Sequence, residues 1–387
     1  MAARHFENFA VNSPKWLSPG NLFEPGNVNI MKDYRWSRPL RRSMSKGTSL
    51  AKLICVIAIL VLPLVASGAD KSCWLSDAAS PAPSVAYLLC EQGAVFTTTD
   101  GGTKFSSVDT GIVGRHLAMA FTDLNHGLIV GDAGMVLATE DGAKTWKPRE
   151  SGTKEHLRAI CNVGEAIWVA GFDGVLIHSS DGGKTWEKQK SGTSQTLEGI
   201  YFLDPNHGWA VGWAGTILRT SDGGKKWTEV KSEAASWSLS SVYFRDLQNG
   251  WTMGFSGQLL RSRDGGATWV AQIACDNPAT AKPGECTPVK SWLTSVAFER
   301  GNRAWITADD QFLMSDDGGE KWKAVDYAGQ LYMRRFLPVG DVLWAVGQLG
   351  VLKQVGAEWK PVESLVVGSA AIMNLANPTK KKDGPSE

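Results

Sequence analysis

The chain has 387 residues, 43% of them hydrophobic, and a net charge of +1, so it is long enough for one large domain or two ordinary ones. Segment 1–69 holds nine Lys or Arg but only three Asp or Glu, and the chain without it is acidic. Affinity for nucleic acid rests on basic side chains that neutralise phosphates, so no nucleic-acid partner is expected.

The first element in chain order is an apolar run at 53–65, LICVIAILVLPLV. It is too short for a comfortable transmembrane helix. Lys46 and Lys52 precede it, and the small residues Ser67-Gly68-Ala69 follow it. This pattern predicts that 1–69 is a leader with a secretory signal segment, cleaved near Ala69. A retained membrane anchor is the alternative. After cleavage we expect a monomer that is peripheral to a membrane at most.

Residues 1–43 make this leader unusually long, and Met44 would begin a well-proportioned signal by itself. One interpretation is a start placed too far upstream. The other is a two-part plastid targeting sequence, because Arg41-Arg42 precedes the apolar run and acidic residues are few.

The cysteines fit an exported protein, which meets oxidising conditions. Cys275 and Cys286 bracket a segment rich in Pro and Gly, and Cys73 and Cys90 lie close together, so we expect these two pairs as disulfides. Cys161, in an apolar strand pattern, is expected to be a buried free thiol. A zinc site would need a CxxC or a His pair at ligand spacing, and neither occurs in the sequence. We expect no metal and no other cofactor.

One motif recurs along the rest of the chain. Its copies are TTDGGTKF (98–105), TEDGAKTW (139–146), SSDGGKTW (179–186), TSDGGKKW (220–227), SRDGGATW (262–269), SDDGGEKW (315–322) and the degenerate LKQVGAEW (352–359). An aromatic or apolar residue precedes most closing aromatics by 18 positions, and a Gly-x-x-Gly turn lies between the two. A period near 40 with several short strands per repeat is typical of propeller blades.

The sequence therefore predicts an all-β fold, a seven-bladed β-propeller over 70–365, with a strand remnant and disordered tail over 366–387. In the third repeat we expect strands at 157–163, 166–171, 175–180 and 185–191. The longest interval between motifs contains Asn277 to Thr287, which we interpret as a stapled loop between blades five and six.

The repeated motif, an Asp-box, is expected to be structural. Its carboxylate can accept backbone N–H bonds across its own turn, and its Trp can fill the gap between blades. The box residues are Asp100, Asp141, Asp181, Asp222, Asp264 and Asp317, with Trp146, Trp186, Trp227, Trp269 and Trp322. The further ligands and the terminal Glu of a calcium loop are absent from the motif.

Such boxes occur in sialidases, xyloglucanases, sortilin-type receptors and photosystem II assembly and stability factors. Segments 201–227 and 242–269, with F-x-D-x-x-x-G-W, G-x-x-G and a box, resemble blades of the last family. The resemblance covers about residues 80–360. It implies a non-catalytic protein, exported to the periplasm or the thylakoid lumen, that binds a membrane-protein polypeptide during assembly.

The sequence offers few candidates for an enzyme site. A sialidase would need three converging arginines and a Tyr–Glu pair, and no R-I-P segment occurs. Asp132 and Asp173 lie in equivalent turns and are the best candidates for a glycosidase pair. A glycoside-binding or glycoside-hydrolysing propeller and a permanent subunit of a cell-envelope complex therefore stay as alternatives.

Binding predicts a surface rich in aromatic residues and Arg, the types enriched at interface hot spots. Propeller geometry places the turns after the second strands and the links between blades on one face, with the boxes on the other. The residues expected on the first face are Phe172, Trp213 and Phe255 from the turns, and Trp237, Trp292, Tyr332, Arg334 and Arg335 from the links.

Overall fold

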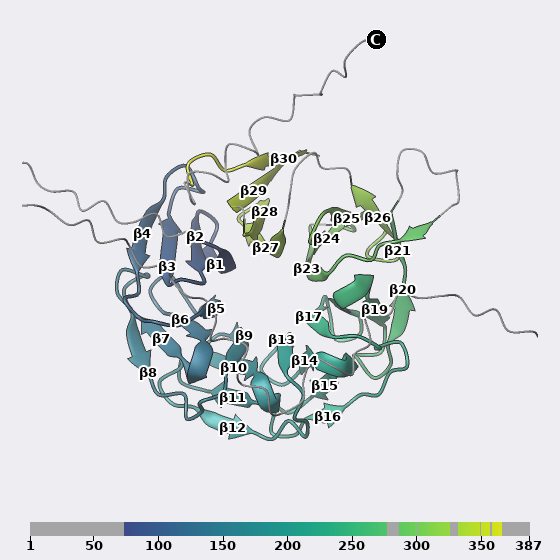
Figure 1. The fold of residues 1–387 in the computed structure, drawn as a ribbon, viewed down its shortest axis with the longest axis horizontal. Coiled ribbons are helices and arrows are strands. Elements are labelled where there is room, and N and C mark those ends of the chain that lie inside the picture. Colours follow the sequence, from purple (N-terminus) through teal and green to yellow (C-terminus); the bar gives the residue numbers. More distant parts are fainter. Residues whose placement is uncertain are drawn as a thin grey trace, which may run out of the picture. The chain divides into compact units, whose positions relative to one another are not determined.

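A computed structural model of the protein describes residues 73–276, 286–299, 301–325, 332–348, 350–356 and 358–365. The expected leader and tail lie outside these residues. Within them the chain forms seven sheets arranged in a circle around a central channel, which confirms the seven-bladed β-propeller (Figure 1). None of the described helices is long and apolar enough to cross a membrane.

Each blade contains four antiparallel strands in chain order, and the first of these four lies at the channel; in blade 6 two further strands precede the four. Blade 1 holds β1 (Leu75–Ala82), β2 (Val85–Cys90), β3 (Ala94–Thr98) and β4 (Ser106–Asp109), and blade 2 holds β5 (His116–Phe121), β6 (Gly127–Gly131), β7 (Val136–Thr139) and β8 (Lys147–Arg149). Blade 3 holds β9 (Leu157–Val163), β10 (Ala166–Gly171), β11 (Leu176–Ser179) and β12 (Glu187–Gln189), and blade 4 holds β13 (Leu197–Phe202), β14 (Gly208–Gly212), β15 (Ile217–Thr220) and β16 (Thr228–Glu229).

Blade 5 holds β17 (Leu239–Phe244), β18 (Gly250–Gly254), β19 (Leu259–Ser262) and β20 (Val270–Gln272), and blade 7 holds β27 (Met333–Val339), β28 (Val342–Gly347), β29 (Gly350–Val355) and β30 (Glu358–Pro361). Blade 6 has six strands: β21 (Ala274–Asp276), β22 (Thr287–Pro288), β23 (Leu293–Phe298), β24 (Ala304–Ala308), β25 (Phe312–Ser315) and β26 (Trp322–Val325). Four single-turn 3-10 helices follow the second strands of blades 2 to 5: η1 (Asp132–Gly134), η2 (Phe172–Gly174), η3 (Trp213–Gly215) and η4 (Phe255–Gly257).

The extra strands of blade 6 belong to the segment that the sequence marks as a stapled loop. β21 leaves blade 5 and pairs in parallel with β26 of blade 6, and β22 returns antiparallel to β21. The disulfide Cys275–Cys286 closes this hairpin, and Cys73–Cys90 links the start of the propeller to β2. Both predicted disulfides are present. The Cys275–Cys286 disulfide stabilises the connection between blades 5 and 6.

Aromatic side chains fill the seams between blades. In the seam of blades 3 and 4, Trp168 stacks on Phe202 with 3.7 Å between ring centroids, and Trp227 meets Phe202 edge-on at 5.8 Å. The Trp168 indole donates a 3.0 Å hydrogen bond to the carbonyl of Gly223 in the box of blade 4. Related stacks join Tyr87 to Phe121 and Trp209 to Phe244, and Trp251 contacts Phe298 in a tilted arrangement. The repeated aromatic of one blade therefore packs on the first strand and the box of the next.

The box turns are stabilised by their own side chains. In blade 3, Asp181 accepts the backbone N–H groups of Lys184 and Thr185 at 3.0 and 2.9 Å, and the Thr185 hydroxyl donates to it at 2.7 Å. The Ser179 hydroxyl donates to Asp181 at 2.7 Å and accepts the N–H of Gly183 at 2.8 Å. These contacts, led by those of Thr185, lower the pKa of Asp181. Related bonds occur at Asp100, Asp141, Asp222, Asp264 and Asp317.

The seam of blades 2 and 3 lacks the ring stack. Leu128 stands where the other blades have Trp or Tyr, and Asn162 stands where blades 2, 4 and 5 end their first strand with Phe. A small cavity of about 30 Å³ lies there, bordered by Leu128 and Gly183. Trp186, the box Trp of this seam, is only half-buried, whereas Trp146 and Trp227 are 8% and 7% exposed.

Candidate binding face and channel

Three of the candidate residues, Phe172, Trp213 and Phe255, each begin a 3-10 turn on one face of the propeller. The backbone N–H of Phe172 donates to the carbonyl of His156 at 2.9 Å, and that of Trp213 donates to Thr196 at 2.9 Å. The same bond joins Phe255 to Ser238 at 3.0 Å. Each turn is thereby tied to the residue that precedes the first strand of its own blade.

The glycine that ends each turn is required by close packing. At Gly174 φ is +65°, and a Cβ atom there would lie 2.0 Å from the carbonyl oxygen of Thr193. Asp173, the residue before it, also has a positive φ of 51°. The turn geometry is therefore fixed by backbone contacts, and its first side chain is free to face outward.

The first aromatic cluster lies over blades 3 and 4. Phe172 is 5.0 Å from the ring of His156 and 6.3 Å from that of Trp213, and Trp213 is 42% exposed. The Trp213 indole donates to Glu198 at 2.9 Å, and the other oxygen of Glu198 accepts two bonds from Arg158 at 2.9 and 2.8 Å. This exposed ring is therefore held by an ion pair at the channel mouth.

The second aromatic cluster lies over blades 5 and 6. Phe255 is 6.1 Å from Trp237 and 6.5 Å from Trp292, and the Arg334 guanidinium lies 5.1 Å above the Trp292 ring. Trp237 is 50% exposed and Phe255 52%. Two expected groups, from the turns and from the links between blades, thus meet on one face. Large exposed rings that gather in this way are typical of an interaction surface.

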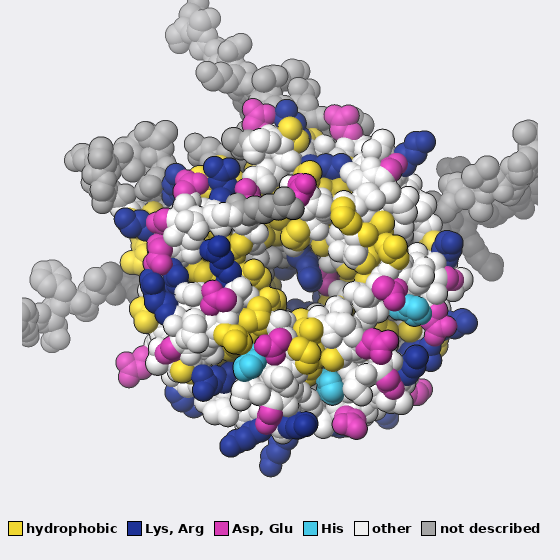
Figure 2. All heavy atoms as spheres, turned by 180° about the vertical axis from the view of Figure 1, so that it is seen from behind, with side chains coloured by type: hydrophobic (Ala, Val, Ile, Leu, Met, Phe, Trp, Pro, Cys, Tyr) yellow, Lys and Arg dark blue, Asp and Glu magenta, His cyan; other side chains and the backbone are white. Residues whose placement is uncertain are grey.

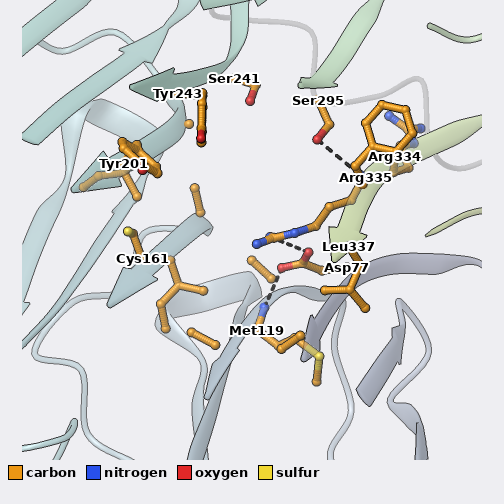
Figure 3. A pocket seen from close by; sticks show the side chains of 18 of the residues that line it. Asp77, Met119, Cys161, Tyr201, Ser241, Tyr243, Ser295, Arg334, Arg335 and Leu337 are labelled. Carbon is orange, nitrogen blue, oxygen red and sulfur yellow. Dashed lines mark hydrogen bonds and ion pairs between the residues drawn. The ribbon is translucent and has the colours of Figure 1, made fainter. Parts of the chain in front are cut away.

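Arg335 lies apart from both clusters, whereas Tyr332 is linked to the second one through Asp309, whose backbone N–H donates to the carbonyl of Trp292 at 3.2 Å. Tyr332 is 47% exposed, and its backbone N–H donates to Asp309 at 2.8 Å. Arg335 instead points into the central channel, where its Nη1 pairs with the Asp77 carboxylate at 2.7 Å (Figure 3). Arg335, expected on the face with the aromatic residues, therefore lies in the channel instead, and the sequence did not mark Asp77 as its partner.

The central channel has a volume of about 650 Å³. Its wall is made by the first strands of all seven blades and carries Asp77, Arg158, Glu198, Arg334 and Arg335 as its charged side chains among the described residues. Figure 2 shows the face turned away in Figure 1, where apolar side chains gather around the mouth of this channel. Alternate residues of a strand point to the same side, and in the first strand of most blades one such position holds a small residue. This repeated small residue was the signal in the sequence that could have located the cavity.

The candidate glycosidase acids do not form a matched pair. Asp132 and Asp173 lie in equivalent turns but at different positions, because Asp132 occupies the place of Phe172. Asp132 accepts a 2.9 Å hydrogen bond from His156, within the surface described above. Three arginines do line the channel, as a sialidase would require, but Arg158 and Arg335 are each paired with a carboxylate.

The described residues contain no group of three His, Cys, Asp or Glu that could hold a metal ion. Cys161 is a free thiol on the channel wall, half-buried rather than fully enclosed, and burial raises its pKa. His126 and His207 bond to Asp123 and Asp204 within their own turns.

The sequence model of the family described as photosynthesis system II assembly factor YCF48 matches residues 103–193, 186–287 and 230–334. The solved structure of YCF48 from Cyanidioschyzon merolae is 16% identical, has a TM-score of 0.57, and the match covers 76% of this chain and 97% of that one. An ancestral GH74 enzyme is 13% identical, with a TM-score of 0.54 and coverage of 76% and 48%. At such identities the likeness shows the fold alone.

A structure of YCF48 bound to a D1 peptide is 19% identical and covers 65% of this chain and 94% of its own, but its TM-score is 0.37. No peptide position is therefore transferred from it. No curated protein matches the sequence.

Proposed function

Because this chain belongs to the family of the photosynthesis system II assembly factor YCF48, we propose that it is an exported, non-catalytic binding protein. It holds a polypeptide segment of a membrane protein, or of an envelope complex, during assembly. The observation that carries the proposal is the face on which Phe172 and Trp213 meet, beside the cluster of Trp237, Phe255, Trp292 and Arg334.

The physical basis is a rigid surface with fixed anchors. The turns that carry Phe172, Trp213 and Phe255 are bonded to their own blades, and Glu198 orients the Trp213 indole. A segment that binds such a surface loses its own conformational freedom but meets side chains that are already ordered. Aromatic residues and Arg in this setting supply most of the binding energy of an interface.

Export is the second part of the proposal. Two disulfides fit an oxidising compartment, such as the periplasm or, in a phototroph, the thylakoid lumen. The apolar run at 53–65 and the residues Ser67-Gly68-Ala69 support cleavage near Ala69. N-terminal sequencing of the protein from its own cell should find a start near Asp70. A membrane-embedded product that keeps 53–65 would contradict this part.

The binding face is best tested by site-specific photocrosslinking in isolated membranes. A benzophenone amino acid at Phe255 should crosslink to segments of membrane proteins, identified by mass spectrometry. The matched control places the same probe at Lys184, an exposed residue of a box turn on the opposite face. Equal crosslinks from both positions, or none to a membrane protein from Phe255, would exclude the face.

Once a segment is identified, variants separate anchors from bystanders. Trp213→Ala and Arg334→Ala should each weaken its binding by about 2 kcal/mol or more, roughly thirtyfold, whereas Lys184→Ala should not. Full affinity in both folded face variants would exclude this surface. A glycan-hydrolysis screen on the purified protein tests the glycosidase alternative. If it shows turnover that Asp132→Asn or Asp173→Asn abolishes, the glycosidase alternative is correct; no turnover argues against it.

A further inference from the structure

The third residue of each first strand lines the channel. Five blades place only small residues at this level: Ala118, Ala159, Gly199, Ser241 and Ser295. The other two blades place Asp77 and Arg335 there. At Gly199 a Cβ would lie 2.9 Å from the carbonyl oxygen of Ser240, so the neighbouring blade leaves no room for a larger residue. This level of the channel wall, called the hollow level below, thus carries small residues and a single ion pair.

Asp77 orients Arg335 across this hollow level. The Asp77 side chain is buried, and its two oxygens accept the backbone N–H groups of Ala78 and Met119, each at 2.8 Å. The same carboxylate holds Arg335 Nη1 at 2.7 Å. A guanidinium has five N–H donors, and the described hydrogen bonds of the Arg335 side chain use one of them. The others are available to a ligand in the channel.

Two tyrosines add neutral hydrogen-bond donors to the channel wall, each two residues after the small residue of its strand. The side chains of Tyr201 and Tyr243 lie on its wall (Figure 3), with 5.2 Å between their rings, and neither hydroxyl has a hydrogen-bond partner among the described residues. Burial raises the pKa of both, so each hydroxyl keeps its proton and can donate. The tyrosine hydroxyls of blades 4 and 5 and the N–H groups of Arg335 in blade 7 that do not bond to Asp77 therefore line the same channel.

We propose that the central channel is a binding site for a small carboxylate, with Arg335 as its main ligand and Asp77 as the residue that positions Arg335. The charged side chains of the wall are three arginines against Asp77 and Glu198. This leaves an excess of one positive charge, which one carboxylate balances, whereas a phosphate group carries a charge of about −1.5 to −2. A volume of about 650 Å³ is within the range of ligand sites. Arg158, Glu198 and Arg334 also contact the exposed aromatic clusters, so the site adjoins that face. Its recognition by Arg335 does not depend on the proposed function.

Calorimetry with benzoate, and with benzamide as its neutral isostere, tests the proposal on the whole folded protein. Benzoate should bind saturably in the millimolar range or below. Benzamide, which lacks the charge that Arg335 pairs with, should bind at least about tenfold more weakly. Inorganic phosphate should bind more weakly than benzoate. Equal affinity for benzoate and benzamide, tighter binding of phosphate, or no saturable heat would overturn the assignment.

Variants locate the site. Arg335→Gln should weaken benzoate binding by at least about tenfold, and Arg335→Lys, which keeps the charge but loses the planar fork, should give an intermediate loss. Ser241→Leu should block the hollow level with Arg335 intact. Arg263→Gln, an exposed residue paired with Glu320, is the control and should bind like wild type. Thermal melts confirm that each variant folds. Unchanged binding in folded Arg335→Lys and Ser241→Leu would place the ligand elsewhere.

Discussion

The indole N–H of Trp209 in blade 4 donates a 3.0 Å hydrogen bond to the carbonyl oxygen of Gly265 in the box of blade 5. A Cβ atom on the next residue, Gly266, would lie 2.5 Å from the same indole nitrogen. The box turn of one blade is therefore shaped to receive the ring of the preceding blade, and this explains the second of the two glycines that follow the aspartate.

Replacing Trp209 measures the strength of this seam. Trp209→Phe keeps an aromatic ring against Phe244 but loses the hydrogen bond, so the free energy of unfolding should fall by about 1 kcal/mol or more. Trp209→Ala, which also leaves a cavity, should cost about 3–5 kcal/mol. Urea unfolding gives both values. Trp237→Phe, at an exposed position, is the control, and an equal loss there would argue against a specific seam contact.

The box aspartates should make stability depend on pH. The hydroxyl and then the backbone N–H of Thr145 lower the pKa of Asp141 to about 2, whereas an unfolded aspartate titrates at about 3.9. A lowered folded pKa contributes stability that is present above the unfolded pKa and is lost as pH falls toward the folded one. The free energy of unfolding should therefore decrease between about pH 4 and about pH 2. Asp141→Asn should be less stable at neutral pH and less sensitive in this range. An unchanged pH profile in this variant would contradict a structural role for Asp141.

The seam of blades 2 and 3 should accept a larger side chain. Leu128→Trp places a ring beside the cavity of about 30 Å³ and restores the residue type found in blades 3 to 7. We expect a gain of roughly 1 kcal/mol in the free energy of unfolding. Leu128→Ala, at a buried site, should instead lose about 2–5 kcal/mol. A lower melting temperature for Leu128→Trp would show that Asn162 leaves too little room for the ring.

Thiol labelling tests the cysteine assignment in the protein as its cell makes it. Cys161 is free, and burial raises the pKa of its thiol, so it should react slowly in the folded protein. After denaturation without a reductant, Cys161 should be the one labelled position between 70 and 365. A label on Cys275 or Cys286 before reduction would mean that the hairpin across blades 5 and 6 is open in the cell.

Much of the fold was predictable because the repeat carries its own geometry. The box, the aromatic 18 positions earlier and the glycine turn fix three of the four strands of a blade, and the strands of blade 3 lie close to their predicted ranges. The two clusters on the exposed face followed from the same register, since Phe172, Trp213 and Phe255 occupy one position of the turn.

The channel was less predictable, because the first-strand residues of different blades come together only when the seven blades close into a circle. Asp77 and Arg335 are 258 residues apart in sequence, and nothing local marks them as partners. Arg335 follows Arg334 directly, yet successive strand residues point to opposite sides unless a bulge intervenes. A register shift lies between Met333 and Arg335, where Arg334 contacts Trp292 and Arg335 contacts Asp77 in the channel.

Every blade is made from strands that follow one another in the chain, and the circle closes where β1 meets β27 through side chains such as Asp77 and Arg335. No sheet in the described chain combines strands from both ends of the sequence. A repeat could therefore be duplicated or deleted by a single genetic event without rewiring any sheet. Only the curvature and the width of the channel would have to adjust. In such an architecture the number of blades, and with it the bore available to a ligand, can change in evolution independently of the design of each blade.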